Sequence, residues 1–162
     1  MAKISRRVVL QALGAVGAAA VSGSFTLGLP VRAAAQTLGQ QESVQDGLKR
    51  IFGARPMKDG SGLVKLDVPF IAENGAVVPV GVEIGVAPTA TDYVKTIYIV
   101  ADKNRIPLVA RVTLAPEAGQ AVVGANIRLG ETTDVRVIVE KNDGSLWQVK
   151  REVKVTVGGC GG

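Results

Sequence analysis

An alternation of apolar and polar residues with a period of two dominates the chain from residue 63 onward, and it constrains the fold more than any other feature. In "LVKLDVPFIA" (63–72) one face carries the apolar side chains Val64, Leu66, Val68 and Phe70. In "AVVPVGVEIGV" (76–86) the matching set is Val78, Val80, Val82 and Ile84. Successive side chains of a strand point to opposite faces, so the pattern predicts half-buried β-strands.

Further strand-like runs follow at regular spacing, separated by turn signals such as "ENG", "DKNRIP" and "APEAG". The run "DVRVIVEKNDGSLWQVKREVKVTV" predicts a hairpin around Asp143-Gly144, with the last strand ending at Val157. About seven short strands separated by turns are typical of a β-sandwich. We therefore expect an all-β fold, an immunoglobulin-like β-sandwich of about seven strands, with a core of valine, isoleucine and leucine that includes Phe70.

One short helix is predicted ahead of the strands, in "QQESVQDGLKRIFGARP" (40–56). Its apolar side chains fall on one face at helical spacing: Val44, Leu48, Ile51 and Phe52. Ser43 followed by Asp46 fits a capping pair, and Gly53 is a suitable residue for the helix to end on. An apolar helix face usually packs on its own domain, so we expect this helix to cover part of the core.

The first 35 residues have the layout of an export signal. Arg6 and Arg7 form a cationic head, an apolar run rich in alanine and glycine follows, and Ala33 and Ala35 fit the pattern before a cleavage site. The paired arginines resemble a twin-arginine signal. An uncleaved membrane anchor would need roughly 20 strongly apolar residues, and this run is shorter. We expect twin-arginine export to a bacterial periplasm, cleavage near Ala35 and no membrane anchor afterwards.

Three segments are thus predicted: a signal peptide (1–35), a sandwich domain with its helix (36–157) and a C-terminal arm (158–162). The net charge of +5 is concentrated in the first segment, which holds four basic and no acidic residues. The rest of the chain has 15 basic against 14 acidic residues, without a basic stripe. This charge distribution argues against binding to nucleic acid.

The residue types of the chain exclude most catalytic and metal-binding sites that it could form by itself. There is no histidine, so neither a serine–histidine nor a cysteine–histidine couple can form within it. With a single cysteine and no histidine, a zinc site is not expected either. No glycine-rich phosphate loop joins a strand to a helix. We expect a protein that is not an enzyme by itself and has no metal or cofactor of its own.

The one cysteine, Cys160, lies between Gly158-Gly159 and Gly161-Gly162. Because glycine loses the most freedom on becoming ordered, we expect these residues to form a mobile arm that takes no part in core packing. Three residues past Val157, the thiol could reach roughly 10 Å beyond the strand end. No basic residue follows Lys154 to lower the thiol pKa, so activation should come from a partner.

Other roles for the tail stay open at this point. A disulfide between two chains through Cys160 would give a structural or adhesion module, since one cysteine cannot pair within its own chain. The terminal Gly161-Gly162 also fits a ubiquitin-like carrier that uses its C-terminal carboxylate. That chemistry needs ATP, which an exported protein would lack.

The ending "VKVTVGGCGG" resembles the SoxY family, the sulfur-carrier subunits of bacterial periplasmic thiosulfate oxidation. The resemblance extends over "VKLDVPFIAENGAVVPVGVEI", "DKNRIPLVARVTL" and "ANIRLGETTDVRVIVEKNDGSLW". It implies that Cys160, on a swinging arm of Gly158, Gly159, Gly161 and Gly162, bears covalent sulfur intermediates.

The resemblance also implies a set of partners. A second small β-sandwich subunit, SoxZ, would form a heterodimer with the chain. A haem enzyme, SoxAX, would join thiosulfate to Cys160, and the dimanganese hydrolase SoxB would release sulfate. Where it is present, the molybdenum–haem enzyme SoxCD would oxidise the sulfur that remains.

Overall fold

The computed structural model describes residues 41–117, 119 and 121–159. The predicted signal peptide, with Arg6 and Arg7, lies outside the described residues, and so do Cys160, Gly161 and Gly162. One helix, α2 (Val44–Phe52), precedes nine strands. The strands are β1 (Met57–Asp59), β2 (Val64–Asp67), β3 (Ile71–Ala72), β4 (Val78–Ile84), β5 (Val94–Ala101), β6 (Leu108–Thr113), β7 (Val122–Ile127), β8 (Thr133–Lys141) and β9 (Leu146–Val155).

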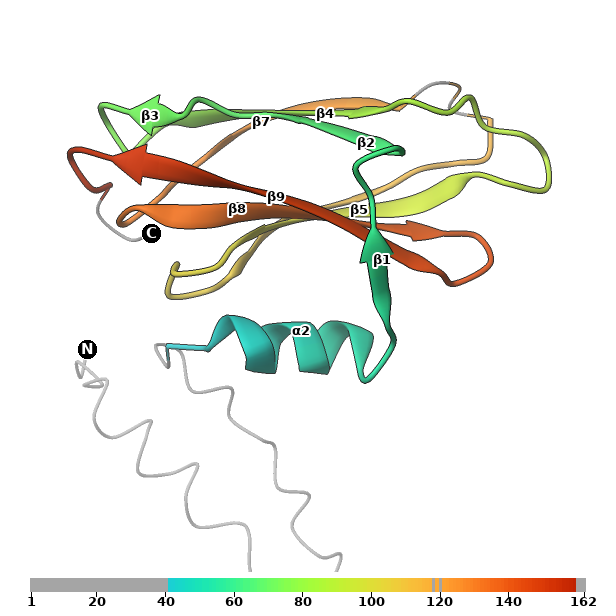
Figure 1. Cartoon of the computed structure of the whole chain (residues 1–162), viewed down its shortest axis with the longest axis horizontal. Coiled ribbons are helices and arrows are strands. Elements are labelled where there is room, and N and C mark those ends of the chain that lie inside the picture. The colour runs from blue at the N-terminus through green and yellow to red at the C-terminus, as the bar shows by residue number, and fades with distance from the viewer. Residues whose placement is uncertain (1–40, 118, 120, 160–162) are drawn as a thin grey trace, which may run out of the picture. The chain divides into compact units, whose positions relative to one another are not determined.

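The strands form two sheets packed face to face, which confirms the predicted β-sandwich (Figure 1). The larger sheet has the order β1-β9-β8-β5-β6, with β3 also pairing with β9, and the smaller has the order β2-β4-β7. Nine strands replace the expected seven or so because β1 and β3 are short segments that add to the edge of β9 in parallel. The predicted hairpin is present, with Gly144 at φ 80° in the turn between β8 and β9.

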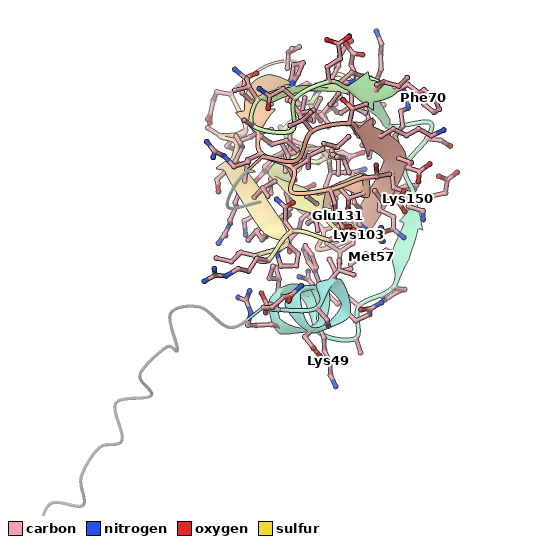
Figure 2. The ribbon with its side chains drawn as sticks, turned by 90° about the vertical axis from the view of Figure 1, so that its left-hand side faces the viewer. Lys49, Met57, Phe70, Lys103, Glu131 and Lys150 are labelled. Atoms are coloured by element: carbon pink, nitrogen blue, oxygen red, sulfur yellow. The ribbon has the colours of Figure 1, made fainter. Side chains whose placement is uncertain are left out.

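The period-two pattern gives the correct inner faces for most positions. Val64, Leu66 and Val68 are buried, and so is the alternating set of β4, Val78, Val80, Val82 and Ile84. Phe70, however, is 60% exposed, so its predicted place in the core is wrong. The chain leaves β2 at Asp67 and crosses to the other sheet, where the Phe70 carbonyl accepts from Lys154 N–H. The alternation ends at that crossing, and Phe70 projects outward (Figure 2).

Helix α2 packs on its own domain, as predicted. Ser43 caps it by accepting a 3.1 Å hydrogen bond from Asp46 N–H, and Gly53 ends it with φ 65° and a 2.8 Å bond to the Lys49 carbonyl. Its apolar face covers the outer side of the larger sheet and forms a second core cluster (Figure 1). In that cluster the rings of Phe52 and Tyr98 meet edge to face, 4.8 Å apart. Among the described residues, no helix is long and apolar enough to cross a bilayer.

Glu140 fastens the segment after α2 to the sheet. Its carboxylate accepts hydrogen bonds from Arg55 Nη1 at 2.7 Å and from the Tyr98 hydroxyl at 3.0 Å. The hydrogen bond from Arg55, more than any other contact, holds the pKa of Glu140 below its ordinary value of 4.5. Burial, followed by the bond to Glu140, raises the pKa of Tyr98. Both shifts favour a charged Glu140 beside a neutral Tyr98 in the folded state.

We predict that Glu140→Gln lowers the free energy of unfolding by about 1 kcal/mol at pH 7, because the charge-assisted contacts are lost. The folded-state pKa is depressed, so the contribution of Glu140 is complete above pH 4.5 and lost as the pH falls through the folded value. Urea titrations at several pH values should show the two proteins converging in acid. The exposed Glu152→Gln serves as a control, and a difference that persists in acid would contradict the prediction.

Candidate functional site

Hydrogen bonds to other segments run along the C-terminal segment from the end of β9 onward. Lys154 N–H donates to the Phe70 carbonyl at 2.9 Å, and Thr156 N–H donates to the Ala72 carbonyl at 3.1 Å. Gly75 N–H then donates to the Val157 carbonyl at 2.7 Å. These bonds hold residues 154–157 alongside residues 70–75, so this described segment stays attached to the domain after the strand ends.

The last of these contacts involves Gly159, whose N–H donates to the Leu129 carbonyl at 2.9 Å. Leu129 N–H in turn donates to the Gly75 carbonyl at 2.7 Å. Gly159 is buried, and a Cβ atom on it would lie 2.7 Å from backbone atoms of Gly75 and Ala76. Backbone atoms can approach this closely only where a side chain is missing. Any larger residue at position 159 would therefore collide with the neighbouring backbone.

Gly158 and Gly75 are restricted in the same way. A Cβ atom on Gly158 would collide with the carbonyl oxygen of Gly130, and one on Gly75 would collide with that of Leu129. Residues 75–76, 129–130 and 157–159 thus come together at one end of the sandwich, the end that faces the viewer in Figure 2. They contact one another through backbone atoms and not through side chains. We call Gly75, Gly130, Gly158 and Gly159 the glycine junction.

The glycine junction corrects one expectation for the tail. We expected none of the glycines from 158 onward to take part in packing, and for Gly158 and Gly159 this is wrong. The physical reason is a set of non-local backbone contacts to residues 75–76 and 129–130, which no periodicity in the tail reveals. The assignment of these residues to a carrier arm remains a prediction, and so do the roles of Cys160, Gly161 and Gly162.

Asn104 secures the loop that carries Leu129 and Gly130, and sequence reasoning missed it. Its side chain is 6% exposed; Nδ2 donates to the Arg128 carbonyl at 2.7 Å, and Oδ1 accepts from Gly130 N–H at 3.4 Å. An asparagine in "DKNRIP" indicates a turn, and that much is correct. Nothing local in the sequence shows that its amide reaches a loop 24 residues away.

The surface around the glycine junction is apolar in part. Val77 is 61% exposed and follows Ala76, against which Gly159 packs. Val157 is 64% exposed, and its carbonyl oxygen accepts from Gly75. Glu131, next to Gly130, lies on the same end of the sandwich (Figure 2). This part of the molecule therefore presents bare backbone, two valines and nearby charged groups.

The described residues offer no metal centre beside the junction. No group of three or more potential metal-ligating side chains occurs among them. A small hollow, lined by Ile84, Val94 and Leu114 among others, lies at the far end of β4 from Gly75. At the end of the sandwich that leads into Cys160, the described residues include the acidic Glu131 but no cluster of potential metal ligands.

The comparisons with known proteins agree with this picture. The sequence profile of the family described as sulfur oxidation protein SoxY matches residues 48–160. The chain belongs to the SoxY family. It is also similar to the solved sulfur carrier protein SoxY from Chlorobium limicola f thiosulfatophilum, at 31% identity and a TM-score of 0.59. That alignment covers 71% of this chain and 97% of the other.

A second solved structure shares only the fold with this SoxY-family chain. The superoxide reductase (neelaredoxin) from Ignicoccus hospitalis is 21% identical, with a TM-score of 0.50, over 57% of this chain and 80% of the other. At that identity the likeness says nothing about activity. No protein among the curated sequences compared matches the chain significantly.

We predict that Gly75→Ala destabilises the domain by about 1–3 kcal/mol, because its methyl group would press on the Leu129 backbone and cannot be accommodated without a shift. Gly124→Ala in β7 is the matched control, since a Cβ atom there has nothing within 4 Å. The control should be neutral or slightly stabilising. Thermal and denaturant unfolding would measure both, and equal stability of the two variants would contradict the close approach at Gly75.

Proposed function

We propose that this SoxY-family chain is a covalent sulfur carrier and that Cys160 is the attachment point. The observation that carries the proposal is the position of the thiol. Cys160 is the only cysteine of the chain, the match to the family ends on it, and it directly follows Gly159 in the glycine junction. A single thiol that directly follows an ordered backbone segment is a suitable attachment point for a sulfur group on which partner enzymes act.

The proposed chemistry needs partners at each step. Joining thiosulfate to the thiol forms a sulfur–sulfur bond and gives Cys–S–S–SO3⁻, with one proton and two electrons released to the haem enzyme SoxAX. Hydrolysis by SoxB then breaks the bond between the outer sulfane sulfur and the sulfonate sulfur. Water supplies the hydroxyl to the sulfonate, which leaves as hydrogen sulfate, and the proton to the sulfur that stays behind as Cys–S–SH.

The chain itself is proposed to be non-catalytic and to have no cofactor beyond the sulfur it carries. A largely ionised thiolate at neutral pH requires a lowered pKa or a neighbouring base, and the chain has no histidine to act as one. Activation is therefore assigned to the enzyme that receives Cys160. SoxZ is the proposed second subunit, and SoxCD, where present, would oxidise the Cys–S–SH group further.

We predict reductant-labile adducts on the peptide that contains Cys160. Because it is the only thiol, all covalent cargo should be there, as one S2O3 unit or one extra sulfur atom. Intact-mass and peptide mass spectrometry of protein isolated from thiosulfate-grown cells, with and without reductant, would detect it. Cys160→Ser is the control. Finding only a disulfide-linked dimer would argue against the carrier and favour a structural module.

Export to the periplasm by the twin-arginine route, with cleavage near Ala35, is part of the proposal. It rests on Arg6, Arg7 and the Ala33-x-Ala35 pattern. N-terminal sequencing of the periplasmic protein should begin near Gln36. Replacing both arginines by lysine should leave the precursor in the cytoplasm, whereas a mature periplasmic protein that keeps Met1 would contradict the cleavage.

A further inference from the structure

Two consecutive peptide units meet at Leu129, and each of them is hydrogen-bonded on two opposite edges. A trans peptide is planar, and its C=O and N–H groups point in opposite directions. In the first unit, the Arg128 carbonyl accepts from Asn104 Nδ2 at 2.7 Å. The N–H on the opposite edge of that unit belongs to Leu129 and donates to the Gly75 carbonyl at 2.7 Å. This unit cannot rotate without breaking the bond to Asn104 or the bond to Gly75.

The second unit is held in the same way and leads directly to the C-terminal segment. Its N–H, from Gly130, donates to Asn104 Oδ1 at 3.4 Å. Its carbonyl, from Leu129, accepts from Gly159 N–H at 2.9 Å. One asparagine side chain thus fixes both peptide planes to which Gly75 and Gly159 are bonded. Because hydrogen bonds along a chain of groups polarise one another, the bonds to Asn104 also strengthen those on the opposite edges.

The loop that carries Asn104 is anchored at the ends of two central strands. Asn104 N–H donates to the carbonyl of Ala101, the last residue of β5, at 3.1 Å. Lys103 N–H donates to Oγ1 of Thr133, the first residue of β8, at 3.0 Å. The side-chain amide of Asn104 is buried, and reversing it would place donor against donor and acceptor against acceptor. The amide therefore has one favoured orientation on a fixed base.

We infer that Asn104 is a positioning residue of the proposed carrier, which through Leu129 fixes the place of Gly159, the residue directly before Cys160. The inference rests on the proposed carrier function, because an attached cargo is what gives that place a use. Asn104 acts through the backbone of another loop and not on the cargo itself. An enzyme that acts on Cys160 meets the preceding backbone in one place, which lowers the cost of bringing the reacting groups together.

Hydrogen exchange in the unaltered protein tests the connection without reference to sulfur chemistry. The amides of Gly130 and Gly159 lie on the two edges of one peptide unit's hydrogen bonds, so they should exchange through one shared opening. Their opening free energies and urea dependences should agree and should lie below those of the core residue Ile99. Rapid exchange at Gly159 while Gly130 stays protected would overturn the positioning role.

A variant tests the side chain itself. Asn104→Ala removes both bonds to the loop, so the exchange rate of Gly159 relative to Ile99 should rise by about tenfold. Asn142→Ala is the matched control, because the Asn142 amide also joins one backbone carbonyl and one backbone N–H, but beyond the opposite end of β8. The control should stay within about twofold. An unchanged rate at Gly159 in folded Asn104→Ala would overturn the inference. If that variant does not fold, the shared opening in the unaltered protein decides.

Loading kinetics connect the position to the proposed function. With purified SoxAX and thiosulfate, Asn104→Ala should lower kcat/KM for the carrier by about tenfold, and Asn142→Ala should leave it within about twofold. If the unaltered protein is never loaded, the proposed function fails, while the exchange data still report whether Asn104 holds Gly159. If Asn104→Ala loosens Gly159 but is loaded at the unaltered rate, the carrier function holds and the positioning role is wrong.

Discussion

The backbone of Leu129 joins the described C-terminal segment, at Gly159, to the core. Its N–H donates to Gly75, its carbonyl accepts from Gly159, and its side chain is fully buried between the sheets. A turn, an interstrand loop and the C-terminal segment are therefore held by a residue that cannot move without disturbing the interior. Because protein interiors are close-packed, that attachment is stiff. Asn104 also braces the same loop through its buried amide.

Much of the fold is predictable from the sequence because it rests on local regularities. The alternation around Val64 and Val80 gives the inner faces, Ser43 and Gly53 give the helix limits, and the turn at Gly144 gives the hairpin. Each of these features is set by neighbouring residues acting through period, capping or backbone conformation. The carrier role of Cys160 is suggested by residue type and position, and no contact is needed to suggest it.

The features that the sequence does not reveal all depend on contacts between distant segments. Phe70 continues the period of β2, yet it lies outside because the chain crosses between the sheets at that point. Gly158 and Gly159 look like flexible filler until residues 75–76 and 129–130 are seen against them. Asn104 looks like an ordinary turn residue. In each case the deciding partner lies far away along the chain, beyond the reach of any local pattern.

Glycine on both sides of Cys160 therefore has two different physical explanations. Before the cysteine, Gly158 and Gly159 are small because the backbone of another loop occupies the space where a side chain would be. For Gly161 and Gly162, which lie outside the described residues, the sequence argument is access: a thin segment can follow the thiol into a narrow cleft. For the proposed carrier, the backbone contacts before Cys160 would keep the segment on its domain, and a slender end after it would limit obstruction inside an enzyme. The same residue type can thus stand on either side of one thiol for different physical reasons.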